Sequence, residues 1–457
     1  CRKNFQDRLE NMVRTIRDKI LSGELGKGDY LPPERMLAKA FGMSNKSVRQ
    51  GLDILASERL IEKIPRVGNK VVGSPAGGTV TLHFGYYASL SEQAAMGSLM
   101  EQFQKLHPNI RVRPVPLPSS HSFRAVKPLL DEGALDVVTL NINDFADFVE
   151  NGGTDDLETL DPNPRIYPFL TEAMKHRGEL KVQPLIFSPL VLCYNKDHFR
   201  QKNLLEPDSG WRWSDLFEHA AILAVENERL GFYFHFPSSN RWPVFLLQSG
   251  TGLEWDDRGK TRIRGTQLID SLRVCRELIS IQTGFPLILS ERDADAEELF
   301  FSGKVSMIMT SYFSLNHQPR KPKFRYDLSP LPYLNESRTL LLIIGLAVNR
   351  HSKAKDSARL LVEFLTSYRA QLVIRQKTLS IPSVKPAAEW SGKDTMYRPS
   401  RFHVYREIIP TFRVLSSLRM SMRQLALFHR EARLYWSGLE TEEAVAERLE
   451  RLLSHSE

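Results

Sequence analysis

The chain has 457 residues, of which 42% are hydrophobic, 25% charged and 9% aromatic. This composition is typical of globular proteins and excludes a disordered, collagen-like or coiled-coil chain. The net charge of +8 is unevenly placed, because residues 1–75 hold 15 Lys and Arg against 9 Asp and Glu, while the remainder holds 47 against 45. A basic N-terminal unit beside a nearly neutral body is expected when only one part meets a polyanion.

The longest apolar run covers residues 339–348, which is far short of the roughly 20 residues that span a bilayer. We expect a buried strand there and no membrane contact. The cysteines Cys1, Cys193 and Cys275 are too scattered for a disulfide framework or a zinc site, and the N-terminus lacks the pattern of a secretion signal. We therefore expect a cytoplasmic protein without metal or cofactor. Cys1 leaves open a mature lipoprotein, which also begins with cysteine.

The N-terminal residues predict three helices and a hairpin. Apolar side chains recur at steps of three and four over residues 5–21, which indicates an amphipathic helix. A second helix begins at Pro33 and ends near Gly42, and Ser44 is a suitable N-cap for a third helix over residues 45–57. Two strands, at 60–64 and 70–72, surround a basic tip. A helix-turn-helix with a basic second helix, followed by a hairpin, is a winged helix that enters the major groove.

These residues resemble the signature of the GntR family of winged-helix regulators across residues 5–73, above all in the motif Leu31-Pro32-Pro33-Glu34-Arg35. The resemblance implies a mainly α domain with a small β wing that contacts DNA through Arg35, Asn45, Lys46, Ser47, Arg49, Arg66, Gly68 and Lys70. Asn45 stands where the family usually has Arg, which puts the base preference in doubt, because Asn suits adenine and Arg suits guanine. Any single one of these side chains could instead be a solvated surface residue.

The body begins after a segment of small, Pro- and Gly-rich residues at 74–79, which is typical of a linker. The pattern then predicts a strand at 80–84, a helix at 90–106 and strands at 110–115 and 135–140. Strands that alternate with helices indicate a parallel α/β sheet.

From Thr79 onward the chain resembles the solute-binding proteins of ABC transporters of the sugar and oligosaccharide type, most clearly in Tyr194-Asn195-Lys196-Asp197 and Phe300-Phe301-Ser302-Gly303-Lys304. That group folds as two α/β lobes that close on a ligand. The resemblance implies a multidomain protein, with a winged helix over 1–75, a linker over 76–79 and a two-lobed, periplasmic-binding-protein-like body over 80–457. Lobe 1 would cover about 80–190 and 331–395, and lobe 2 about 191–330 and 396–457.

The same resemblance implies a set of ligand-binding residues at strand ends and in the hinge: Tyr86, Tyr87, Asn141, Asn143, Asp144, Ser188, Trp242, Tyr312 and Phe313. Aromatic faces can cover the C–H faces of a sugar ring, while amides and carboxylates pair with its hydroxyls. Structural roles stay open, because the aromatic residues could belong to the core, and one of Asn141, Asn143 and Asp144 could cap a helix.

No nucleotide-binding, nucleophile-elbow, zinc-protease or dinucleotide motif is present, so we expect no catalytic residues and no enzyme. The joint prediction is a bacterial transcriptional regulator that binds double-stranded DNA as a homodimer at an inverted repeat. A sugar or oligosaccharide bound between the lobes would modulate operator binding. The alternatives are a sugar receptor of a transport system and a pyridoxal-phosphate-dependent regulator or enzyme, although no lysine placed for a Schiff base is found.

Overall fold

A computed structural model of the protein describes residues 2–21, 24–58, 60–65, 67–72, 79–118, 123–257, 259–281, 289–319, 322–393 and 396–454. The chain divides into two compact units, one of residues 1–82 with 100–113 and one of residues 83–99 with 114–457. The expected linker at 76–79 stays a prediction, because residues 76–78 lie outside the described residues. Among the helices described, none combines the length and the apolar character needed to cross a membrane.

The first unit contains the predicted winged helix, with α1 (Arg2–Leu21), α2 (Glu34–Phe41), α3 (Asn45–Ser57), β1 (Ile61–Ile64) and β2 (Gly68–Val71). Ser44 caps α3 as expected, since its side chain accepts a hydrogen bond from the backbone N–H of Ser47. Met12, Val48 and Leu52 are fully buried in a core that the three helices and the hairpin share. The domain therefore has its own hydrophobic centre.

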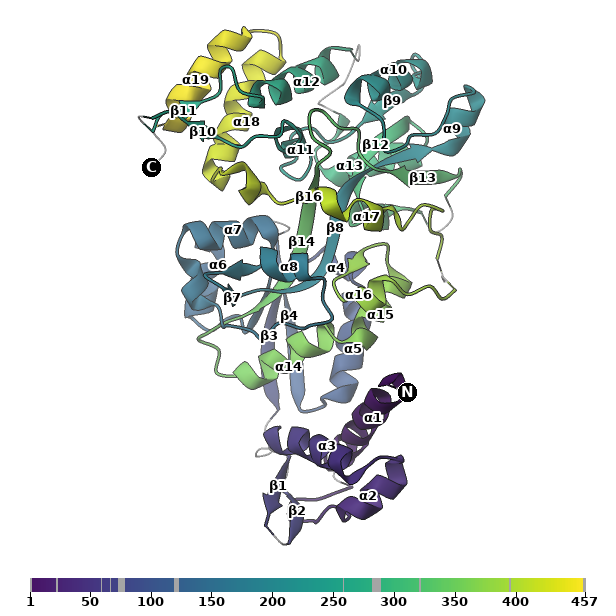
Figure 1. Ribbon diagram of the computed structural model, residues 1–457, viewed down its shortest axis with the longest axis vertical. Helices are drawn as coiled ribbons and strands as arrows, with labels where there is room; N and C mark the ends of the chain where they lie inside the picture. Colours follow the sequence, from purple (N-terminus) through teal and green to yellow (C-terminus); the bar gives the residue numbers. More distant parts are fainter. Residues whose placement is uncertain are drawn as a thin grey trace. The chain divides into compact units, whose positions relative to one another are not determined.

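The body alternates helices with strands (Figure 1). Its strands are β3 (Val80–Tyr87), β4 (Ile110–Leu117), β5 (Val137–Asn141), β6 (Lys175–His176), β7 (Glu179–Leu180), β8 (Gln183–Asn195), β9 (Leu230–Tyr233), β10 (Glu254–Trp255), β11 (Thr261–Arg262), β12 (Val305–Ser311), β13 (Tyr326–Ser329), β14 (Thr339–Val348), β15 (Ile381–Pro382) and β16 (Phe412–Arg413).

Its described helices are α4 (Leu90–Gln93), α5 (Met96–Leu106), α6 (Phe123–Asp131), α7 (Ile142–Glu150), α8 (Pro168–Ala173), α9 (Lys196–Gln201), α10 (Trp213–Leu223), α11 (Pro243–Gln248), α12 (Leu268–Ile281), α13 (Asp293–Phe301), α14 (Lys355–Leu365), α15 (Tyr368–Lys377), α16 (Lys385–Ala388), α17 (Val404–Glu407), α18 (Met422–Trp436) and α19 (Glu442–Ser454). Short 3-10 turns include η1 (Gly153–Asp156), η3 (Ser314–His317), η4 (Ile409–Thr411) and η5 (Leu415–Leu418).

Two long strands, β8 and β14, join the two lobes of the body and run side by side (Figure 1). Residues 183–189 of β8 pair with β14, whereas residues 190–195 pair with β12 and β13. The sheet follows the order β4-β3-β5-β14-β8-β12-β9. The apolar run at 339–348 is β14, and all ten of its residues are buried, as the sequence predicted.

The structure corrects two sequence expectations. The sheet is mixed rather than parallel: β3 pairs with β5 and β9 with β12 in parallel, but β14 runs antiparallel to both β5 and β8. This follows because β14 returns from one lobe to the other. The helix expected over 90–106 is broken into α4 and α5, since Ala95 has a φ of 50° that a right-handed helix does not allow.

Candidate functional site

The exposed surface of the winged helix carries basic and polar residues on α2 and at the start of α3. Arg35, Asn45 and Lys46 are all exposed. Within the described residues, the side chains of Arg35 and Lys46 have no hydrogen-bond or ion-pair partner. Free cations of this kind are available to the phosphates of a duplex.

Arg49 and Ser47 have partners inside the domain. Arg49 Nε donates to Glu34 Oε2 at 2.7 Å, and the Arg49 side chain remains 66% exposed. An exposed ion pair contributes about 1 kcal/mol or less, so Glu34 holds the Arg49 side chain only weakly. Ser47 is 8% exposed and bonds to Ser44, so in this arrangement it serves the helix cap.

The wing contributes the last of the predicted DNA contacts. Gly68 is exposed and has a φ of 139°, a value that side-chain-bearing residues rarely adopt. The Lys70 amine lies 6.0 Å from the centre of the Tyr30 ring, and residue 30 forms a bridge to residue 70. Arg66 lies outside the described residues. The DNA-contact set therefore stays a prediction, with its described members except Ser47 at least partly accessible.

In lobe 1, three of the predicted ligand residues form a closed hydrogen-bond group at the ends of β3 and β5. Tyr87 Oη donates to Asp144 Oδ2 at 2.5 Å and accepts from the Asn141 backbone at 2.8 Å. The Asn141 side chain caps α7, accepting from the backbone N–H groups of Asn143 and Asp144. Burial and the neighbouring Asp144 raise the pKa of Tyr87 well above its ordinary value. Tyr86, which stacks on Phe84 in the same strand, remains half-exposed.

Ser188 and Tyr312 meet where β8 passes between the lobes. Ser188 Oγ donates to the Pro189 carbonyl and accepts from the Tyr312 backbone N–H at 2.7 Å. Tyr312 is fully buried, and its hydroxyl donates to the Phe402 carbonyl at 2.7 Å. Phe313 is 6% exposed. Ser188 and Tyr312 thus bond to neighbouring segments, and both aromatic rings are buried.

Trp242 lies in the core of lobe 2. It is 2% exposed, and its ring packs against Phe428, His429 and Trp436 at centroid distances of 5.1 to 6.1 Å. Trp242 therefore occupies the core position that the sequence had left open as an alternative to ligand binding. A ligand contact by Trp242 would need a rearrangement, and the ligand-binding set as a whole stays a prediction.

The remaining predicted residue, Asn143, lies where lobe 1 and lobe 2 meet. Its Nδ2 donates to Asn240 Oδ1 at 3.2 Å. It also lines a hollow of about 250 Å³ between α7 and the segment that leads from η5 into α18. Lys175, His176 and Ser416 add polar groups to the largely apolar wall. Glu150, at the other end of α7, accepts from the Met422 backbone N–H at 3.0 Å, and burial raises its pKa.

Sequence reasoning missed Asn240, Glu150 and Gln93. The Gln93 Oε1 atom is buried without a hydrogen-bond partner among the described residues, at the end of α4. Such an acceptor calls for a water or ligand donor. No local signal distinguished Asn240 and Glu150 from ordinary surface residues, because their hydrogen-bond partners lie far along the chain.

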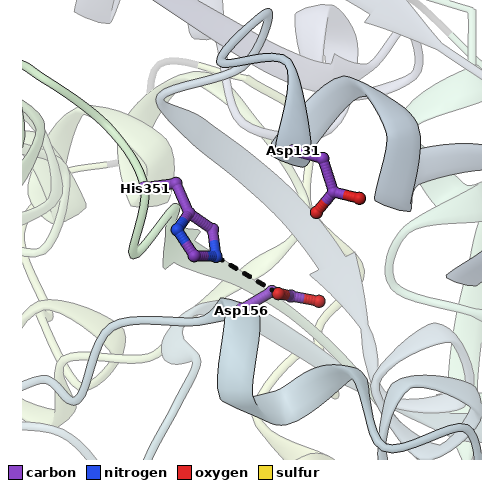
Figure 2. A group of neighbouring side chains, drawn as sticks. All are labelled: Asp131, Asp156 and His351. Atoms are coloured by element: carbon purple, nitrogen blue, oxygen red, sulfur yellow. Dashed lines mark hydrogen bonds and ion pairs between the residues drawn. The ribbon is translucent and has the colours of Figure 1, made fainter.

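One group of potential metal ligands lies on lobe 1, formed by Asp131, Asp156 and His351 (Figure 2). His351 Nε2 lies 3.3 Å from Asp156 Oδ1. The Lys127 amine lies 2.7 Å from Asp131 and 3.1 Å from Asp156, and these contacts raise its pKa. Because the Lys127 amine pairs with both carboxylates and the group is largely exposed, we assign it to surface ion pairing.

Two family models match the chain in separate regions. The model of bacterial extracellular solute-binding proteins matches residues 87–372, and the model of bacterial regulatory proteins of the gntR family matches residues 9–71. The N-terminal region is thus a GntR winged helix, and the body is a solute-binding-protein domain, as the sequence indicated.

Curated relatives match the two regions separately. The sn-glycerol-3-phosphate-binding periplasmic protein of Pectobacterium atrosepticum is 24% identical over 255 residues, which cover 51% of this chain and 54% of that protein. An uncharacterised HTH-type transcriptional regulator of Mycobacterium tuberculosis is 43% identical over 68 residues, 15% of this chain and 28% of that protein. The chain thus spans about half, or less, of the length of these relatives.

Solved structures share the fold of the body. An ABC substrate-binding protein from Listeria monocytogenes in complex with cycloalternan has a TM-score of 0.68 at 18% identity, covering 82% of this chain and 98% of that one. Maltose-bound MalE3 of T. maritima gives the same TM-score and identity, with 82% and 99% covered. The maltotriose-bound MalE domain from Bdellovibrio bacteriovorus has a TM-score of 0.65 at 17% identity, with 82% and 98% covered.

Proposed function

Because the chain belongs to the family of bacterial extracellular solute-binding proteins and begins with a GntR winged helix, we propose that it is a ligand-responsive transcriptional regulator. The winged helix binds a DNA operator. The two-lobed body binds a sugar or oligosaccharide in its cleft, and occupancy of the cleft sets operator affinity.

The observation that carries this proposal is that one chain contains both a DNA-binding type of domain and a solute-binding type of domain. One is a domain whose helices carry the exposed cations Arg35 and Lys46, which have no partner in the part of the chain that the structure describes. The other is a body whose lobes are joined by the paired strands β8 and β14, so that its two lobes can rearrange around a ligand. Coupling requires that the ligand bind one lobe arrangement better than the other.

We also propose that the protein acts as a homodimer at an inverted-repeat operator in the bacterial cytoplasm. Two winged helices related by two-fold symmetry read two half-sites on one face of the duplex. A DNA-binding domain has its target only where the chromosome is.

The first experiment is a thermal-shift screen of the full chain against mono- and oligosaccharides, among them maltose and maltotriose, together with sn-glycerol 3-phosphate. Similar structures hold such sugars, and a curated relative is named for that phosphate ester. A ligand at 100 times its dissociation constant stabilises the protein by about 2.7 kcal/mol. A shift with a saccharide supports the proposal. A shift with the phosphate ester alone would change the proposed ligand from a sugar to a small anionic solute. No shift with any compound would contradict the proposal that the body senses a sugar.

The second experiment tests the DNA interface with operators selected from a random duplex library. Loss of one good base contact costs about 1–3 kcal/mol, so Arg49→Ala should weaken operator binding roughly ten- to a hundredfold. Arg14→Ala is the matched control, because Arg14 is an exposed arginine on α1 that bonds only to Asn11 in the described chain. Equal affinities for the two variants would contradict the assignment of α3. Sugar binding without DNA binding by the parent would favour a transport receptor.

A further inference from the structure

The two ends of α7 are tied to lobe 2. Asn143, in its first turn, donates to Asn240 at 3.2 Å, and Glu150, its last residue, accepts from the Met422 backbone at 3.0 Å. Asn240 lies between β9 and α11, 97 residues away from Asn143. The Asn143–Asn240 contact, here named the lobe latch, joins the lobes directly and needs no third molecule. It occupies the amide of a residue that the sequence predicted to bind ligand.

A chain of hydrogen bonds holds Asn240 in place on lobe 2. The backbone carbonyl of Asn240 accepts a hydrogen bond from Arg241 Nη1 at 3.1 Å. Its backbone N–H donates to Ser238 Oγ at 3.2 Å, and Ser238 in turn donates to Asp293 Oδ2 at 3.1 Å. The loop of residues 238–242 is therefore fastened to α13 from both sides of Asn240.

Beneath this loop lies a buried cluster of charges. The Arg241 side chain is 2% exposed, with Nη1 lying 3.4 Å from Asp293 Oδ2 and Nη2 lying 3.5 Å from Glu297 Oε1. Arg241 also donates to Ser314 on η3 at 2.9 Å, and Thr310 on β12 donates to Glu297 at 2.6 Å. The cluster thus links the loop to α13, β12 and η3.

Two carboxylates share this one guanidinium and remain incompletely satisfied. Asp293 Oδ1 and Glu297 Oε2 are buried without a hydrogen-bond partner among the described residues. A buried ion pair contributes little net stability, because desolvation offsets the attraction. Because the cluster adds little stability and leaves two carboxylate oxygens unpaired among the described residues, it is better explained by the loop that it positions.

We propose that Arg241 and Glu297 are positioning residues, which hold the 238–242 loop so that Asn240 binds Asn143 and latches the lobes together. A ligand that accepts this hydrogen bond from Asn143 replaces Asn240, so the latch opposes binding of that kind and favours the direct contact of the lobes. The competition with ligand rests on the proposed function of the cleft, whereas the latch itself is a property of the protein alone.

The test measures the distance between the lobes in the purified full chain without added ligand. Spin labels are placed by Glu132→Cys on lobe 1 and Glu218→Cys on lobe 2, both at exposed positions. Cys1→Ser removes the N-terminal thiol, while Cys193 and Cys275 are buried and stay unlabelled. Because no ligand is used, a failed saccharide screen leaves this measurement unaffected, and the two proposals fail separately.

Asn240→Ala removes the latch at a half-exposed position and should lower the ratio of closed to open lobes about two- to tenfold, the effect of one net hydrogen bond. At pH 8, above the pKa of about 7 that burial gives Glu297, Glu297→Gln should lower this ratio as well. Glu298→Gln, the same change at the exposed neighbour, should match the parent. The double variant Asn240→Ala/Glu297→Gln should equal Asn240→Ala, because Glu297 acts through Asn240. An unchanged distance distribution in Asn240→Ala, or additive effects in the double variant, would overturn the proposal.

Discussion

The buried carboxylate of Glu297 should make the stability of the body depend on pH. Burial raises its pKa from an ordinary 4.5 to about 7, against the opposing attraction of Arg241, with Asp293 adding to the rise. Thr310 on β12 bonds to it, and the Cys193 thiol on β8 also lies within its electrostatic reach. The unfolded chain releases this proton near pH 4.5, whereas the folded chain keeps it until about pH 7.

The sign follows from this difference in proton binding. Below about pH 4.5 Glu297 is protonated in both the folded and the unfolded chain, and its contribution to the free energy of unfolding is fully present. This contribution is lost as the pH rises through 7. A shift of this size corresponds to roughly 3 kcal/mol. Glu297→Gln has no proton to release, so the parent should lose about 3 kcal/mol more of unfolding free energy than the variant between pH 4.5 and pH 8.

Urea denaturation followed by tryptophan emission is the appropriate assay. All six tryptophans lie beyond residue 210, so the signal reports on the body and not on the winged helix. Glu298→Gln serves as the control for the loss of a surface carboxylate. A parent-minus-variant difference that stays constant between pH 4.5 and pH 8 would refute the assignment of a retained proton to Glu297.

Two further substitutions test the packing of each part. Leu52→Ala truncates a fully buried side chain of the winged helix and should lower the stability of that domain by about 2–5 kcal/mol. Operator binding should then be lost at temperatures at which the tryptophan emission of the body is unchanged. Retained operator binding would contradict a separate core in the winged helix. Gly231→Ala places a Cβ 1.9 Å from the Ala220 carbonyl oxygen and should cost about 1–3 kcal/mol in urea unfolding. Gly97→Ala, in open space on α5, should instead be neutral or stabilise by up to about 1 kcal/mol, and equal effects of the two changes would contradict the close approach of β9 and α10.

The ligand-binding residues were only partly predictable from the sequence. From their position after a strand we expected that one of Asn141, Asn143 and Asp144 could cap a helix, and Asn141 does so. Capping depends on residues two and three positions away, so it is encoded locally. The same reasoning could not separate a tyrosine that packs from one that binds. Tyr312 and Trp242 are buried because Phe402 and Phe428 happen to cover them, and those partners lie 90 or more residues further along the chain.

The features that the sequence by itself determined are local. They are the helices and wing of the N-terminal domain, the buried strand β14, and the difference in net charge between the basic winged helix and the nearly neutral body. Hydrophobic period, capping and turn residues encode such features within a few positions. Only the tertiary structure decided that Asn143 meets Asn240 and that Arg241 lies beside Glu297, 56 residues away. Contacts of this kind form when separate elements pack, and no pattern within either element records its partner.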